Sequence, residues 1–167
     1  MPTSVKILHT EPVTHDVRRY RVEKPDGFSF EPGQATDVAF DKEGWRKGPG
    51  VFIAGGAGVT PFIAILRKLA ADGRLDGHTL IASHKTEEDI ILRDEFEAMP
   101  GLTCIWTVTG EESSPLNRGK IDKGFLQHHV ESFDQNFYVC GPDQMVDDIK
   151  ATLKDLGADA DGITFEE

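Results

Sequence analysis

Cysteines and long apolar runs are scarce in this sequence of 167 residues. Two cysteines, Cys104 and Cys140, are too few for a disulfide framework or a cysteine-based metal site, so a reducing cytoplasm is the expected location. No apolar run reaches the ~20 residues that a membrane-spanning helix needs. The first ten residues, MPTSVKILHT, also lack the apolar stretch of a signal peptide. We therefore expect no membrane partner.

Basic residues are few relative to acidic ones. The chain has 18 Lys and Arg against 29 Asp and Glu, which gives a formal net charge of -11. Proteins that bind nucleic acids neutralise phosphates with Lys and Arg, so this balance excludes a nucleic-acid partner from the expected functions. The six histidines show no metal-ligand spacing, and no metal is expected. The length predicts one domain, or one domain with an appendage.

The chain has two consecutive parts with different residue patterns. Residues 1–40 are rich in Val, Ile, Thr and Tyr with partial alternation, and KPDG and EPGQ interrupt them with turn residues, which predicts strands. From Val51 onward, short apolar strands alternate with helical patterns, as in βαβ units. We predict strands at 51–54, 78–83, 102–108, 137–140 and 162–165, and helices at 61–72, 87–98, 121–131 and 142–156. The predicted fold is an α/β open parallel sheet in residues 48–167, preceded by a short antiparallel β segment in residues 1–47.

A glycine-rich junction, VFIAGGAGVTPFIAIL at 51–66, links the first of these strands to a helix. Thr60 is the predicted N-cap, and Pro61 the first helical residue, where its missing N–H costs nothing. The glycines permit positive φ and close approach of a ligand, and a helix N-terminus behind them favours an anion. The pattern is neither the Rossmann fingerprint nor a Walker loop. Taken alone, it also fits a tight turn that binds nothing.

A second junction, FYVCGPDQM at 137–145, repeats the arrangement of strand, glycine, proline and helix, with Pro142 as the predicted first helical residue. In one parallel sheet, both junctions would lie at the carboxyl ends of their strands. Ligands of open α/β sheets bind at that edge. The pair of junctions therefore predicts one shared site for a phosphate-bearing ligand.

Five segments together resemble the ferredoxin–NADP reductase family, and more narrowly its small bacterial flavodoxin/ferredoxin reductase-like flavoproteins: PGQATDVAF, GPGVFIAGGAGVTPFIAILR, HKTEEDIIL, RGKIDKGFL and FYVCGPDQM. The resemblance covers nearly the whole chain. It implies a flavin-binding β-barrel followed by an α/β nicotinamide-nucleotide domain. It also implies an NAD(P)H oxidoreductase that passes hydride between nicotinamide and flavin, and then electrons to an acceptor protein of the ferredoxin or flavodoxin type.

The resemblance also implies particular site residues. Those that would line the dinucleotide pyrophosphate and nicotinamide are Gly55, Gly56, Ala57, Gly58, Val59, Thr60 and Pro61, and those that would flank the nicotinamide ring are Cys140, Gly141, Pro142 and Asp143. Cys140 and Thr60, which would lie beside the reacting ring, are the implied catalytic residues. For Cys140 the alternative is a small core residue at the end of a buried strand.

Nucleotide preference is expected to depend on the segment after the third α/β strand, where Thr109 and Glu111 stand. A carboxylate there accepts hydrogen bonds from ribose hydroxyls and repels a 2′-phosphate, which favours NADH over NADPH. A solvated acidic loop is the alternative reading of this segment. Ser83, His84 and Lys85, at the end of the second α/β strand, are further candidates for contacts with the adenosine side.

The flavin half of the family pattern is incomplete here. The sequence passes from ATDVAF to VFIAGG without the Arg-x-Tyr/Phe-Ser/Thr motif with which the family binds FAD. Residues 1–50 provide about three strands of ~5–6 residues, and three strands do not close a barrel. The simplest explanation is an internal deletion of the second half of the barrel, which would leave an exposed sheet edge open to association. Three hypotheses follow: a flavin-dependent NAD(P)H oxidoreductase, a dinucleotide-binding domain without catalytic flavin, or a barrel completed by a second chain.

Overall fold

The predicted fold class is confirmed: a parallel six-stranded sheet with helices stands beside a separate two-stranded antiparallel sheet. The computed structural model describes residues 6–14, 18–24, 27, 48–159 and 162–165. The segment ATDVAF at 35–40, which belongs to the N-terminal residues predicted to form strands, lies outside the described residues, so the domain boundary between residues 47 and 48 stays a prediction. Among the described helices, none combines the length and the apolar character needed to cross a bilayer.

The order of the strands in the large sheet reverses next to its first strand. The order is β6-β5-β4-β3-β7-β8, and every pair is parallel. These strands are β3 (Gly50–Gly55), β4 (Thr79–His84), β5 (Thr103–Val108), β6 (Asn117–Arg118), β7 (Asn136–Cys140) and β8 (Ile163–Phe165). From β3 the chain builds outward through β4 and β5, then returns to add β7 on the other side. The gap between the ends of β3 and β7 is therefore a topological switch point, where such sheets bind ligands.

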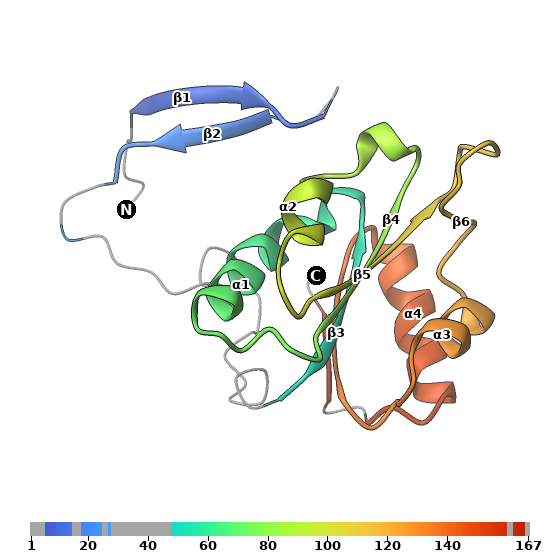
Figure 1. Cartoon of the computed structure of the whole chain (residues 1–167). Helices are drawn as coiled ribbons and strands as arrows, with labels where there is room; N and C mark the ends of the chain where they lie inside the picture. Colours follow the sequence, from blue (N-terminus) through green and yellow to red (C-terminus); the bar gives the residue numbers. More distant parts are fainter. Residues whose placement is uncertain (1–5, 15–17, 25–26, 28–47, 160–161, 166–167) are drawn as a thin grey trace.

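Helices cover both faces of this sheet (Figure 1). The first layer consists of α1 (Thr60–Ala71) and α2 (Arg93–Glu97), and the second of α3 (Lys123–His129) and α4 (Asp143–Asp155). Side chains of β3 alternate between two apolar cores, with Phe52 directed to the first layer and Ile53 to the second. Burial on both faces explains why this strand reads as an unbroken apolar run.

The helix predicted at 87–98 is wrong in its extent. The segment forms one 3-10 turn, η2 (Glu87–Asp89), and then the short α2. Between them Ile90 and Ile91 are both buried, at 6% and 3% exposure. Leu92 takes the left-handed conformation with φ +54° and redirects the chain into α2. The segment 109–120, where no strand or helix is predicted, contains an edge strand, β6.

The N-terminal segment contributes a hairpin of β1 (Ile7–Pro12) and β2 (Arg18–Val22). Its side chains are largely exposed, and Ile7, Leu8 and Tyr20 are each 57% exposed. Val13, which follows β1, packs against the first apolar core. The expectation that this part of the chain associates through an exposed edge stays a prediction.

Candidate functional site: a crevice at the switch point

The first junction is more regular than the sequence predicts. After β3 the chain enters a 3-10 turn, η1 (Gly56–Val59), and continues directly into α1. The N-cap position belongs to Val59, which is itself helical at φ -72° and ψ -18°, and no side chain caps the helix. The predictions that Thr60 is the N-cap and Pro61 the first helical residue are therefore wrong by one position. The uninterrupted passage from η1 into α1 leaves no extended residue to act as a cap.

The second junction also differs by one position, but its helix begins one residue later than predicted rather than one residue earlier. Pro142 has φ -57° and ψ 139° and is the N-cap of α4, so the prediction that it is the first helical residue is wrong. Its carbonyl accepts hydrogen bonds from the amides of Met145 (2.8 Å) and Val146 (3.1 Å). The junction from Cys140 through Pro142 thus ends in a regular first helical turn.

Two glycines let the junctions touch each other. A Cβ on Gly58 would lie 2.6 Å from the carbonyl carbon of Cys140 and 2.7 Å from the nitrogen of Gly141. A Cβ on Gly55 would lie 2.9 Å from Cδ of Pro142. These glycines make room for the opposite junction rather than for a ligand. Gly56 matches the expectation from sequence, because it has φ +52° and nothing within 4 Å of a built Cβ.

A pocket of about 510 Å³ lies where the junctions meet. It extends from the end of β7, past β3 and β4, to the residue after β5. The lining residues are Gly55, Gly56, Ala57, Gly58, Ser83, His84, Lys85, Thr109, Cys140, Gly141, Pro142 and Met145. Most of the predicted site residues are thus brought together at one edge of the sheet. Met145 was missed, although its place one turn into α4 was a usable signal.

Five predicted site residues do not line this pocket: Val59, Thr60, Pro61, Glu111 and Asp143. Val59 is fully buried beneath the first junction. Thr60 and Asp143 are exposed first residues of α1 and α4. For Thr60 and Asp143, the positions of the helix boundaries explain why the side chains do not line the pocket, because successive side chains of a helix point in different directions.

Glu111 has a partner that no local pattern predicts. Its Oε2 accepts a hydrogen bond of 2.8 Å from the backbone amide of Glu87 in η2. Ser114 strengthens the same attachment by donating to Oε1 of Glu87 at 2.6 Å. The carboxylate expected to receive a ribose therefore ties the 109–120 segment to η2.

Two residues set the charge of the pocket. Lys85 is exposed, whereas His84 is 5% exposed, and burial lowers its pKa despite the opposing charge of Asp89. His84 is therefore neutral near pH 7. The described lining residues include no carboxylate, so the pocket carries the positive charge of Lys85 on a chain whose net charge is -11. An anionic ligand is favoured.

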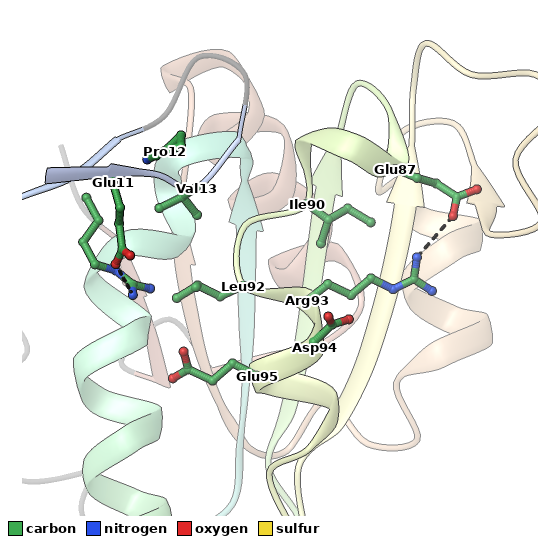
Figure 2. A pocket seen from close by; sticks show the side chains of 10 residues that line it. Glu11, Pro12, Val13, Glu87, Ile90, Leu92, Arg93, Asp94 and Glu95 are labelled. Atoms are coloured by element: carbon green, nitrogen blue, oxygen red, sulfur yellow. Dashed lines mark hydrogen bonds and ion pairs between the residues drawn. The ribbon is translucent and has the colours of Figure 1, made fainter.

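A second pocket of about 540 Å³ lies between the hairpin and the η2–α2 segment (Figure 2). Five of its six charged side chains are already paired, Asp94 being the sixth. Glu11 accepts from Arg19 at 2.9 Å and Glu87 from Arg93 at 3.1 Å. Glu95 binds Arg67, which approaches to 2.6 Å. With these groups satisfied internally, the pocket is less suited to a charged ligand than the switch-point crevice. Within the described ranges, no group of three His, Cys, Asp or Glu side chains could hold a metal.

Comparison with known proteins identifies the domain. Residues 52–151 match the family described as the oxidoreductase NAD-binding domain. The chain belongs to this family. The matched residues contain both junctions and the strands that carry them, so the resemblance to ferredoxin–NADP reductases is confirmed. Family members are oxidoreductases.

Two curated relatives illustrate the range of the family. The chain is 35% identical over 118 residues to a nitrate reductase [NADPH] of Emericella nidulans, and covers 14% of its length. It is 30% identical over 113 residues to NADH-cytochrome b5 reductase 2 of Danio rerio, and covers 36% of that protein. These matches span 64% and 62% of this chain. The chain thus spans about a third or less of the length of these relatives, whose names specify different nucleotides.

One of the solved structures is also similar to this chain. The flavohem-like FAD/NAD-binding domain of nitric oxide dioxygenase from Vibrio cholerae O1 biovar El Tor matches with a TM-score of 0.66 and 26% identity. The match covers 72% of this chain and 51% of that one. The shared part is the α/β domain with its parallel sheet.

Proposed function

We propose that this chain binds a nicotinamide dinucleotide across the switch-point crevice, as the NAD(P)H domain of a flavin-dependent oxidoreductase. The observation that carries the proposal is the contact between Gly58 and the Cys140–Gly141 backbone, because it joins two strand-to-helix junctions into one crevice. In this arrangement the pyrophosphate lies at the N-terminus of α1, and the nicotinamide lies against the second junction.

The pocket has the chemistry that this ligand requires. The N-terminus of the 12-residue α1 favours an anion. Gly56 and Ala57 present little side chain there, so backbone can come close to the phosphates. The crevice crosses the ends of four adjacent strands, β7, β3, β4 and β5, a width of roughly 14 Å at ~4.8 Å per strand. An extended dinucleotide fits that width.

The roles proposed for the two implied catalytic residues now differ. Cys140 lines the pocket and is 8% exposed, so its side chain forms part of the wall that would orient the nicotinamide ring. Thr60 is exposed on the first turn of α1 and does not line the pocket, so we assign it no contact with the ring. For this chain the proposed work is binding and orientation of the nucleotide.

The described residues do not fit a flavin. A flavin would accept the hydride and pass electrons on singly. However, the sequence lacks the Arg-x-Tyr/Phe-Ser/Thr motif, and the described N-terminal residues form only the β1–β2 hairpin. The described residues therefore provide no flavin site. The proposal of an acceptor protein of the ferredoxin or flavodoxin type comes from the resemblance to the family alone.

A second function is favoured by the same hairpin. Two strands with Ile7 and Tyr20 exposed do not enclose a prosthetic group, which fits a nucleotide-binding domain that has no catalytic flavin. Flavin absorption of the purified protein, bleached by NADPH or NADH, would support the enzyme. Colourless protein that still binds nucleotide would support the second function.

Titration calorimetry with NADP⁺ and NAD⁺ tests nucleotide binding itself. Ala57→Asp places a carboxylate in the pocket at an exposed position, and Ala64→Asp places one on the exposed part of α1 outside the pocket. We expect Ala57→Asp to weaken binding by about tenfold or more through charge repulsion, and Ala64→Asp to leave it unchanged. The proposal fails if the wild-type chain binds neither nucleotide, or if Ala57→Asp binds as tightly as wild type.

A further inference from the structure

Lys85 is the one Lys or Arg among the described residues that line the switch-point pocket. It stands directly after β4, and its side chain is exposed. Its backbone is fixed, because the amide of Gly110 donates to its carbonyl at 2.8 Å. No ion pair links its ammonium group to another residue of the described ranges. A fixed base and an uncommitted ammonium group are suited to receive an anion from a ligand.

The place of Lys85 along the crevice indicates which anion. Cys140 lies at the end of β7, and the strands then follow in the order β3, β4 and β5. If the nicotinamide lies at Cys140 and the pyrophosphate at the end of β3, the adenosine ribose lies by the ends of β4 and β5. Ser83, which also lines the pocket there, adds a hydroxyl donor beside Lys85, whereas the Thr109 hydroxyl donates to the carbonyl of His84 at 3.3 Å.

The feature that predicted NADH is missing from this end. A site selective for NAD uses a carboxylate to bind the free 2′-hydroxyl, and that carboxylate repels a 2′-phosphate. Glu111 was the candidate, but its Oε2 accepts from the Glu87 amide, and Glu111 does not line the pocket. What remains near the ribose is the ammonium group of Lys85 and the hydroxyl group of Ser83, and both are phosphate ligands.

We propose that Lys85 binds the 2′-phosphate of the adenosine ribose and makes this chain selective for NADP(H) over NAD(H). The inference rests on the proposed function, since it assumes that a dinucleotide occupies the crevice. It reverses the preference expected from Glu111 alone.

The experiment uses two fragments of the nucleotide on the full chain. The first, 2′,5′-ADP, carries the 2′-phosphate without a pyrophosphate, and the second, 5′-ADP, carries the pyrophosphate without a 2′-phosphate. Calorimetry measures both against wild type, Lys85→Gln and Lys85→Arg. Lys154→Gln, on the exposed C-terminal turn of α4 and outside the pocket, is the matched control for loss of one positive charge.

We expect Lys85→Gln to weaken binding of 2′,5′-ADP by about ten- to a hundredfold, the usual worth of one hydrogen bond between charged groups. Its affinity for 5′-ADP should be unchanged. Lys85→Arg should retain most of the 2′,5′-ADP affinity, and Lys154→Gln all of it. Wild type should also bind NADP⁺ more tightly than NAD⁺.

Four results would overturn the inference. Equal losses for both fragments would assign Lys85 to the pyrophosphate, and no loss for either would remove it from the site. Wild-type protein that binds NAD⁺ as tightly as NADP⁺ would show no selectivity, while the proposed nucleotide-binding function would stand. If wild type binds none of these nucleotides, the proposed function fails together with the inference.

Discussion

Replacing Gly58 by alanine is the most direct test of how the crevice is built. The new Cβ would lie 2.6 Å and 2.7 Å from backbone atoms of Cys140 and Gly141, and real Cβ contacts essentially never fall below 3.0 Å. Neither neighbour can rotate away, because both are backbone atoms at the end of the buried strand β7. The two junctions must therefore move apart.

The expected cost follows from two opposing terms. Overpacking of this kind costs about 1–3 kcal/mol, and a clash with backbone places it near the upper end. Alanine recovers roughly 0.5–1 kcal/mol, because it orders with less loss of conformational entropy than glycine in a helical turn. We expect a net loss of about 2 kcal/mol in the free energy of unfolding, measured by urea denaturation. Calorimetry with NADP⁺ should show an affinity at least about tenfold weaker, since the crevice opens.

Gly73→Ala is the matched control. Gly73 has φ +64° just after α1, with nothing within 4 Å of a built Cβ. Its replacement should cost about 1–2 kcal/mol through left-handed strain alone and leave NADP⁺ affinity unchanged. If Gly58→Ala unfolds within about 0.5 kcal/mol of wild type and binds NADP⁺ normally, the junctions do not depend on this contact.

Three further predictions concern stability and reactivity. Burial lowers the pKa of His78 and His84, so the unfolded chain binds more protons than the folded chain as the pH falls below about 6.5. The free energy of unfolding should then fall by up to ~1.4 kcal/mol per pH unit for each histidine, and a His84→Asn profile as steep as wild type would contradict this. Burial, with the charge of Glu97, raises the pKa of Cys104 to about 11, so at about pH 8 its thiol should react with Ellman's reagent far more slowly in the native than in the urea-unfolded chain; equal rates would rule out the shift. Phe52, 1% exposed and stacked on Tyr138 at 4.8 Å, should cost ~3–5 kcal/mol when changed to alanine, and a loss below ~1 kcal/mol would show that the core collapses around it.

Much of the fold can be read from the local pattern of the chain. Strands buried on both faces, such as β3 and β7, appear in the sequence as continuous apolar runs. The amphipathic pattern of α1 and α4 distinguishes these helices from the strands. The η2–α2 segment was misread, because its apolar pair Ile90–Ile91 fits a helical pattern in sequence while the left-handed Leu92 breaks the helix.

The sequence by itself determined that both glycine-rich junctions share one edge of one sheet, because parallel strands necessarily end on the same side. Only the tertiary structure decided what each residue at that edge contacts. Gly58 meets Cys140, and Glu111 binds an amide 24 residues earlier in the chain. Contacts between distant segments depend on how helices and strands pack, so they cannot be predicted from the residues that are adjacent in sequence. The same packing turned Glu111 away from the pocket and left Lys85 within it.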